Sequence, residues 1–158
     1  MTKQLILRPE KCTNCLTCKL VCSYAHFGEF SPTLSAVAVI DFAEDVVSVP
    51  VMCLQCEDPA CAKVCTVGAI SVRADGRVIF NDDKCIVCKL CVQACPMGNV
   101  TFSSRVHKLL RCDLCGDDPQ CAIWCPTQAI TYAETDDDLE RRTAVAEGFK
   151  DVLKEEVA

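Results

Sequence analysis

Cysteine is the residue type with the clearest chemical meaning in this sequence, because its thiolate is a strong ligand for metals. Sixteen of the 158 residues are cysteine, and they form four runs of four with none left over. We call these runs quartets 1 to 4: Cys12, Cys15, Cys18 and Cys22; Cys53, Cys56, Cys61 and Cys65; Cys85, Cys88, Cys91 and Cys95; and Cys112, Cys115, Cys121 and Cys125. A chain that devotes a tenth of its residues to such runs is built around metal.

The spacing within the quartets suits a cubane iron–sulfur cluster, which needs one thiolate at each of its four iron corners. Quartet 3, followed by Pro96, has the C-x2-C-x2-C-x3-C-P spacing of bacterial ferredoxins. Three closely spaced cysteines can reach three corners of one cube, while the fourth enters a helix and points away. In two-cluster ferredoxins this fourth thiolate binds the neighbouring cluster. The quartets therefore predict four [4Fe–4S] clusters, and with them electron transfer.

Two other uses of sixteen cysteines are less consistent with the spacing. Four zinc sites would also need sixteen thiolates, but structural zinc sites usually take two ligands from each of two separated pairs. They do not need a third and a fourth cysteine so close behind in every run. A disulfide scaffold is typical of short secreted chains, and residues 1–10 show no signal-peptide pattern.

Composition and charge predict a soluble, cytoplasmic protein suited to anaerobic chemistry. The longest apolar run outside the quartets, Ala36 to Ile40, is too short to span a bilayer, so no direct membrane insertion is expected. The formal net charge of −6 would become about −14 with four clusters bound, which makes nucleic acid a poor partner. Because the chain has only six Phe, two Tyr and one Trp, the clusters must supply much of the core, and metal-free chain should fold poorly.

A repeated segment follows quartets 2, 3 and 4, and each copy ends in β-branched and apolar residues that predict a short strand. Each unit is thus a cluster loop, a short helix and a strand. The sequence Ala74-Asp75-Gly76 is a turn signal, so we expect a hairpin around it. The expected hairpin strands are Ile70–Val72 with Val78–Phe80, and Ala36–Ile40 with Val46–Val51; Leu5–Leu7 should form a further strand.

The nineteen residues between Cys65 and Cys85 are close to the separation of the two runs in a compact two-cluster ferredoxin. Quartets 2 and 3 therefore resemble one ferredoxin module, which leaves quartets 1 and 4 to form a second module around it. This nested arrangement resembles the iron–sulfur subunits of molybdenum- and tungsten-pterin oxidoreductases, and of related hydrogenase and carbon monoxide dehydrogenase systems. The stretch from Cys53 to Ile70, with four residues before Cys61, is especially similar to that family's second quartet.

The resemblance covers about residues 4–133, with two departures. Thr66 follows quartet 2 where the family usually has proline, and the gap at 116–120 in quartet 4 is shorter than in many molybdenum reductase subunits. The first departure should alter a turn but not the ligation. The second favours the smaller cytoplasmic members over a membrane-linked reductase.

The resemblance implies an α+β fold of two nested bacterial-ferredoxin-like modules, with short hairpins and helices around four clusters, plus a C-terminal helix. Residues 1–133 would form the polyferredoxin domain, with module A from quartets 1 and 4 and module B from quartets 2 and 3 at about 50–103. It also implies the ligands: Cys12, Cys15, Cys18 and Cys125 for cluster 1; Cys22, Cys112, Cys115 and Cys121 for cluster 2; Cys53, Cys56, Cys61 and Cys95 for cluster 3; and Cys65, Cys85, Cys88 and Cys91 for cluster 4.

Residues 134–158 form an acidic tail with a net charge of −5. Leu139, Val145, Phe149, Val152 and Leu153 fall near one face of a helix, which predicts a helical tail. The helix would either pack on its own domain or dock on another subunit, and the sequence leaves both open.

Motifs of catalysis are missing, since there is no G-x-G-x-x-G, P-loop, H-E-x-x-H or G-x-S-x-G sequence. We therefore expect a non-catalytic electron-transfer subunit bound to a catalytic partner. A tungsten- or molybdenum-pterin enzyme such as an aldehyde oxidoreductase is favoured as that partner. A free soluble ferredoxin-type carrier, and a subunit of a hydrogenase or carbon monoxide dehydrogenase, are the alternatives. Further copies of the chain or a flavin subunit could also join the complex.

Several charged and aromatic residues border the quartets. We interpret His26, next to Phe27 in the sequence, as a packed residue and not as a ligand. The cations that flank the cysteines should be solvated, although positive charge near an anionic cluster would also raise its reduction potential. These cations are Lys11, Lys19, Lys84, Lys89 and Arg111.

Overall fold

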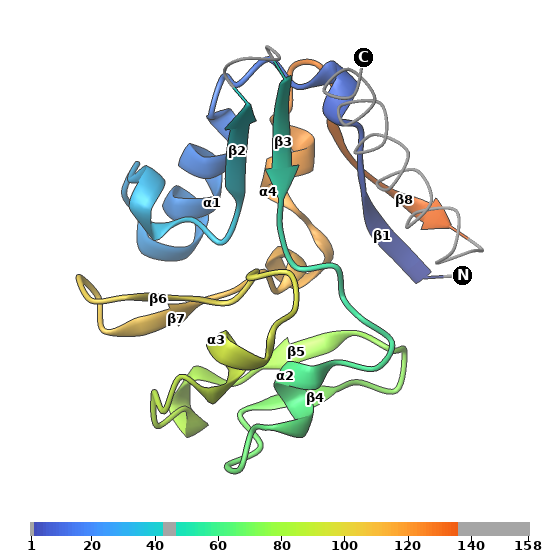
Figure 1. Cartoon of the computed structure of the whole chain (residues 1–158). Coiled ribbons are helices and arrows are strands. Elements are labelled where there is room, and N and C mark those ends of the chain that lie inside the picture. The colour runs from blue at the N-terminus through green and yellow to red at the C-terminus, as the bar shows by residue number, and fades with distance from the viewer. Residues whose placement is uncertain (1, 43–46, 136–158) are drawn as a thin grey trace, which may run out of the picture.

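The computed structural model describes residues 2–42 and 47–135. The predicted C-terminal helix, at 136–158, lies outside the described residues. Within the described part the fold is α+β, with short helices, short antiparallel strand pairs and long connections, as Figure 1 shows.

The strands form four separate two-stranded antiparallel sheets in the described chain. They are β1 (Thr2–Leu7) with β8 (Ile130–Thr135), β2 (Ala38–Phe42) with β3 (Val47–Val51), β4 (Ile70–Val72) with β5 (Val78–Phe80), and β6 (Thr101–Ser103) with β7 (Lys108–Leu110). The two predicted hairpins are confirmed, and the β4–β5 hairpin has the predicted bounds. The sequence did not predict β7 or the pairing of β1 with β8.

Each of the four α-helices in the described residues carries the third cysteine of one quartet. The helices are α1 (Thr17–Phe27), α2 (Ala60–Lys63), α3 (Leu90–Ala94) and α4 (Gln120–Ile123). Helix α1 is the longest because it continues past Cys22 and ends at Gly28, whose φ is +70° and whose N–H donates to the carbonyl of Tyr24 at 2.8 Å. Glycine adopts this left-handed conformation without the steric cost that a Cβ would bring.

Two hydrophobic cores form around the cysteines, one from the outer parts of the chain and one from its middle. Core 1 contains Leu5, Leu7, Cys18, Cys22, Val37, Met52, Cys112, Leu114, Cys121 and Ile130. Core 2 contains Cys61, Ile70, Val78, Cys91, Val100 and Leu109. Figure 1 shows α1, α4 and the pair of β1 with β8 in the upper half of the molecule, and α2, α3 and the pair of β4 with β5 in the lower half. Thiols of quartets 1 and 4 therefore share core 1, and thiols of quartets 2 and 3 share core 2.

The β1–β8 pair occupies the same structural position in the upper half as the β4–β5 hairpin does in the lower half. In both, a strand that follows a quartet pairs with a strand that precedes one. The N–H of Arg8 donates to the carbonyl of Ala129 at 2.8 Å, and the N–H of Asn81 donates to that of Ala69 at 2.8 Å. A 3₁₀ turn then leads into the next cysteine at η1 (Pro9–Lys11) and at η3 (Asp82–Lys84). The two halves are thus built alike, although only one is contiguous in sequence.

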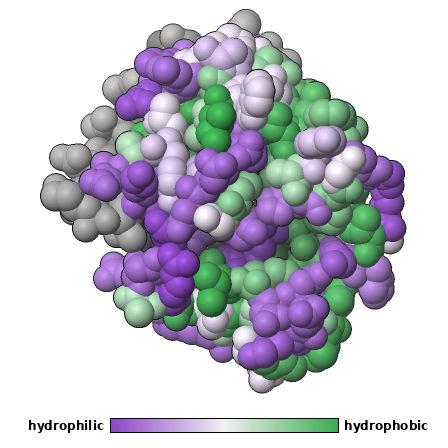
Figure 2. Space-filling model, turned by 180° about the vertical axis from the view of Figure 1, so that it is seen from behind, coloured by the Kyte–Doolittle hydropathy of each residue, from purple (hydrophilic) through white to green (hydrophobic). Residues whose placement is uncertain are grey.

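The surface mixes polar and apolar residues. Figure 2 shows hydrophobic residues in separate patches among hydrophilic ones on the face turned away in Figure 1. Singly scattered apolar side chains are normal on a protein surface, so these patches identify no site by themselves. Among the helices that the structure describes, none combines the length and the apolar character needed to cross a membrane.

Candidate metal centres

The C-x2-C segments of all four quartets share one feature of backbone conformation. The residue just before the second cysteine is left-handed in each, with φ between +50° and +60° at Asn14, Gln55, Val87 and Leu114. A β-branched residue such as Val87 rarely adopts this conformation, which costs about 1–2 kcal/mol for a residue with a Cβ. Strain of this kind persists where the surrounding structure requires a particular geometry, which is typical of functional sites.

The helices that follow begin in two ways, and these sort the quartets into two types. In quartets 1 and 3, a left-handed residue caps the helix, with φ +58° at Leu16 and +64° at Lys89. In quartets 2 and 4, where the gap before the third cysteine is longer, Pro59 and Pro119 take the cap position. Proline has no N–H to satisfy and its fixed φ is compatible with a helix start. Each half of the molecule therefore combines one quartet of each type.

Backbone N–H groups point at several cysteine sulfurs. The N–H of Ile70 lies 3.4 Å from the Cys65 sulfur, that of Val87 3.4 Å from Cys85, and that of Asn99 3.3 Å from Cys95. N–H donors of this kind stabilise thiolates and raise the reduction potential of a bound iron–sulfur cluster.

Six of the thiols are in surroundings that favour the protonated form, whereas hydrogen bonds with Thr17 lower the pKa of Cys15. Burial is the main reason that the pKa of Cys18 is raised to about 11 and that of Cys121 to about 12. Burial likewise raises the pKa of Cys61, Cys91 and Cys115, and raises that of Cys112 well above its usual value. A metal binds the thiolate, so it must displace these protons. All sixteen cysteines lie in the described part of the chain, and they form no disulfide there.

Thiols of different quartets lie close enough to affect one another. After burial, the thiolates of Cys12, Cys15 and Cys125 raise the pKa of Cys18. The thiolates of Cys22, Cys115 and Cys18 raise the pKa of Cys121. The thiolates of Cys53, Cys121 and Cys22 raise the pKa of Cys112.

In the other half of the molecule, the thiolates of Cys53 and Cys95 raise the pKa of Cys61. The thiolates of Cys85, Cys88 and Cys61 raise the pKa of Cys91. Quartet 1 is thus beside quartet 4, and quartet 2 beside quartet 3.

The two halves meet where Cys53 approaches Cys112, and two polar side chains bridge this junction. Gln55 donates from Nε2 to the carbonyl of Cys112 at 3.2 Å and lies 3.8 Å from the Cys53 sulfur, while its Oε1 accepts from the N–H of Val78 at 2.9 Å. The Nη2 of Arg111 lies 3.7 Å from the same sulfur. Cys53 therefore faces two side-chain donors from two different parts of the chain.

The sequence interpretation of His26 as a packed residue is only partly confirmed. Its side chain is 28% exposed, and its Nε2 lies 3.6 Å from the Cys115 sulfur and 3.5 Å from Oδ1 of Asp113. No sequence signal indicates this contact, because His26 follows Cys22 in α1 while Cys115 lies in a loop far along the chain. Gln55 was missed for a similar reason, since its partners also come from distant segments.

This donor set fits iron–sulfur clusters. The sixteen thiols form no disulfide, are mostly buried or half-buried, and are presented in quartets on loops whose strained conformation is repeated four times. Soft thiolate ligands select zinc, copper(I) and iron–sulfur clusters over hard cations. The fold and the site together define a cysteine-ligated metalloprotein.

Comparison with known proteins identifies which kind. Residues 44–135 match the family described as the 4Fe–4S dicluster domain. The polyferredoxin-like subunit of an aliphatic sulfonate oxidoreductase from Pyrococcus furiosus is 35% identical over 122 residues, covering 77% of this chain and 70% of the relative. The B subunit of the anaerobic dimethyl sulfoxide reductase of Escherichia coli is 32% identical over 148 residues, covering 81% and 71%. An uncharacterized ferredoxin of Methanocaldococcus jannaschii is 35% identical over 159 residues, covering 98% and 87%.

The chain belongs to the 4Fe–4S dicluster ferredoxin family. Its predicted character as an iron–sulfur electron-transfer protein without a catalytic role of its own is confirmed. The family match favours iron–sulfur clusters over the zinc alternative for residues 44–135. The sixteen thiols form no disulfide, which is against the disulfide alternative.

Proposed function

We propose that this chain is the electron-transfer subunit of a cytoplasmic oxidoreductase complex and carries electrons through four [4Fe–4S] clusters. The observation that carries the proposal is the complete set of sixteen thiols outside any disulfide, gathered into two cores that each combine two quartets. Clusters bound there would supply one-electron redox chemistry. The residues of the chain would hold them, exclude water from them and fix the distances between them.

The proposed ligand sets are those expected from the sequence, with clusters 1 and 2 in module A and clusters 3 and 4 in module B. Core 1 and the packing of α1 against α4 support a shared module for quartets 1 and 4. Core 2 and the packing of α2 against α3 support the same for quartets 2 and 3. The closeness of Cys125 to Cys18, and of Cys95 to Cys61, supports the exchange of fourth ligands within each module.

Three pairs of neighbouring thiols, each joining two different ligand sets, support a linear order of the clusters. Cys18 lies near Cys121, which would bring cluster 1 beside cluster 2. Cys112 lies near Cys53, which would bring cluster 2 beside cluster 3 across the junction. Cys61 lies near Cys91, which would bring cluster 3 beside cluster 4. Electrons would then enter at one module and leave at the other, because tunnelling falls steeply with distance.

The proposed partner is a catalytic subunit of the tungsten- or molybdenum-pterin class, such as an aldehyde oxidoreductase. Two relatives are named as parts of a reductase or an oxidoreductase, which supports a bound subunit. The ferredoxin from Methanocaldococcus jannaschii matches nearly the whole chain, which favours a free carrier as the second candidate. Purification of the native complex separates the two, since a free carrier would elute at the size of the chain alone.

Metal and sulfide analysis of anaerobically prepared protein tests the proposal. About sixteen iron and sixteen sulfide per chain are expected, with broad visible absorption that bleaches on reduction with dithionite. Protein that holds about four zinc and no sulfide would contradict it.

A further inference from the structure

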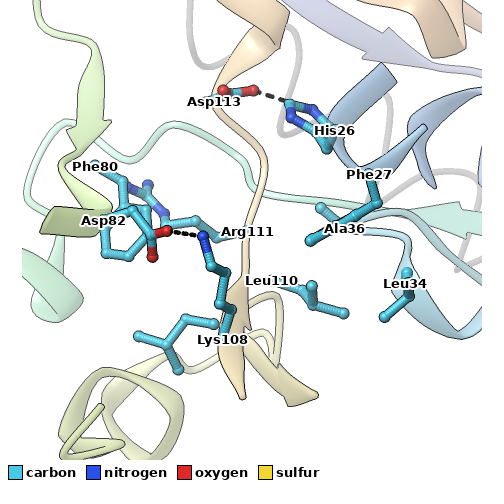
Figure 3. Close-up of a pocket in the computed structure, with 11 residues that line it drawn as sticks. His26, Phe27, Leu34, Ala36, Phe80, Asp82, Lys108, Leu110, Arg111 and Asp113 are labelled. Carbon is cyan, nitrogen blue, oxygen red and sulfur yellow. Dashed lines mark hydrogen bonds and ion pairs between the residues drawn. The ribbon is translucent and has the colours of Figure 1, made fainter. Parts of the chain in front are cut away.

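Arg111 is buried although it carries a charge. Only 6% of the residue is exposed, in the segment between β7 and Cys112. Its side chain lines a pocket with a volume of about 220 Å³. Figure 3 shows this pocket, in which Lys108 pairs with Asp82 and His26 faces Asp113. Arginine is almost never buried in this way unless its charge is paired. Arg111 therefore needs a counter-charge.

The carboxylates that the structure describes do not supply it. Arg77, whose side chain is also poorly exposed, forms ion pairs with Asp117 and Asp75. For Arg111 no carboxylate of residues 2–42 or 47–135 lies within ion-pair distance, and its Nε and Nη1 have no hydrogen-bond partner there. The 3.7 Å approach of Nη2 to the Cys53 sulfur is the polar contact that its side chain makes in this part of the chain. An isolated buried charge is unfavourable, so a negative group at Cys53 would complete the site.

Cys53, whose sulfur the Arg111 guanidinium approaches, is a proposed ligand of cluster 3. A [4Fe–4S] core with four thiolates carries a net charge of about −2 when oxidised and one unit more when reduced. The guanidinium therefore favours the reduced state over the oxidised one.

We propose that Arg111 is the buried counter-cation of cluster 3 and raises its reduction potential. This rests on the proposed function. With the cluster bound, the charge of Arg111 would stabilise an added electron on cluster 3, at the junction between the modules. That electron would come from an adjacent cluster. No proton moves, because the guanidinium stays protonated throughout.

The test is a redox titration of the full-length, anaerobically prepared protein, followed by electron paramagnetic resonance. In Arg111→Met, one of the four midpoint potentials should fall by at least about 59 mV. For a one-electron reduction, this makes the equilibrium constant of reduction about tenfold smaller. Arg111→Lys keeps the charge, so its midpoint potential should stay close to that of the wild type. The signal that moves should be the one altered by Cys56→Ser, which changes a ligand of cluster 3.

Arg105→Gln is the matched control, because Arg105 is an exposed arginine whose partners are Glu29 and Ser31. It removes the same charge, and it should change the equilibrium constant of reduction of each of the four clusters by less than twofold. If Arg111→Met does not retain iron, Arg111→Gln compared with Arg111→Lys provides the same contrast. Intact clusters whose potentials do not respond to loss of the Arg111 charge, or respond equally at Arg105, would overturn the inference. Wild-type protein without iron and sulfide would instead overturn the proposed function.

Discussion

The two proposed modules, A and B, repeat one local architecture but differ in how the chain closes them. In module B, a short turn joins β4 to β5, with the N–H of Arg73 donating to the carbonyl of Arg77 at 2.8 Å. In module A, β1 and β8 are held together from the two ends of the described chain. Nη1 of Arg8 donates to Oγ1 of Thr131 at 3.1 Å across 123 positions of sequence. Module B is therefore local, whereas module A depends on a long-range closure.

The difference indicates how a module built from two distant parts of the chain can remain stable. Closing a loop of roughly 120 residues instead of one of roughly ten costs about 2 kcal/mol more chain entropy. Module A also has the larger core, with ten buried residues against six, and its helix α1 has eleven residues against four or five in the other helices. The greater burial offsets the greater closure cost, since a fully buried Leu or Ile contributes about 1.5–3 kcal/mol.

The largest effects should come from Ile130 and Ile70, which occupy equivalent positions five residues after Cys125 and Cys65. They are 1% and 3% exposed. Truncation of either to alanine should cost about 2–5 kcal/mol through lost burial and a residual cavity. Ile130→Ala should release iron from clusters 1 and 2, and Ile70→Ala from clusters 3 and 4. Iron content and denaturant unfolding of both variants measure this.

The pair of variants is its own control, because each should spare the clusters of the other module. Loss of the same clusters in both variants would show that the modules are not separate units, and the comparison would then be wrong.

A smaller effect is expected at the junction. Gln55→Leu removes donors to Cys53 and Cys112 and leaves the N–H of Val78 without its acceptor. The lost hydrogen bonds should cost about 1–3 kcal/mol, with all sixteen iron retained, and the cost is read from the unfolding midpoint. Leu114, at the equivalent position of quartet 4, is buried in core 1, so leucine is compatible with this backbone conformation.

Gln93→Leu is the matched control, because Gln93 is exposed on α3. It should change stability by less than about 0.5 kcal/mol. Equal effects at Gln93 and Gln55 would mean that Gln55 does not hold the modules together.

The sequence predicted the repeated parts of the fold well. The turn residues around Gly76 were sufficient for the β4–β5 hairpin, and cysteine spacing was sufficient for the presence of short helices. These features are local, so their signal lies within a few residues. The expectation that the fourth cysteine enters the helix holds only for Cys22, because Cys65, Cys95 and Cys125 lie past the ends of α2, α3 and α4. The β1–β8 pairing was missed because a strand pattern does not specify its partner. Strand β7 was missed because its sequence Lys-Leu-Leu has no β-branched residue, unlike the equally short β4, β5 and β6.

The site was predicted as a set of cysteines but without the groups around them. Arg111 was identified only as one of several cations beside the cysteines, since a single arginine carries no sign of its burial. The bridging role of Gln55 and the contact of His26 with Cys115 also depend on distant segments. Sequence spacing indicates the ligands, whereas the electrostatic surroundings come from the tertiary fold.

The smallest effect should come from the exposed pair of Arg105 and Glu29, which joins the β6–β7 connection to the segment after α1. Arg105→Ala should cost about 0–1 kcal/mol, and less at high salt, because water screens exposed ion pairs. Unfolding at low and high salt measures this. A loss of several kcal/mol would contradict this expectation, because it would mean that this exposed ion pair helps to hold the modules together.

The most direct test of the two-module account is an anaerobic crystal structure of the iron-loaded protein, with anomalous scattering at the iron edge. The account expects four clusters, two ligated only by quartets 1 and 4 and two only by quartets 2 and 3. Cys22 should share a cluster with Cys112, Cys115 and Cys121. A structure in which Cys22 shares a cluster with quartet 2, or in which one quartet ligates a cluster alone, would contradict it.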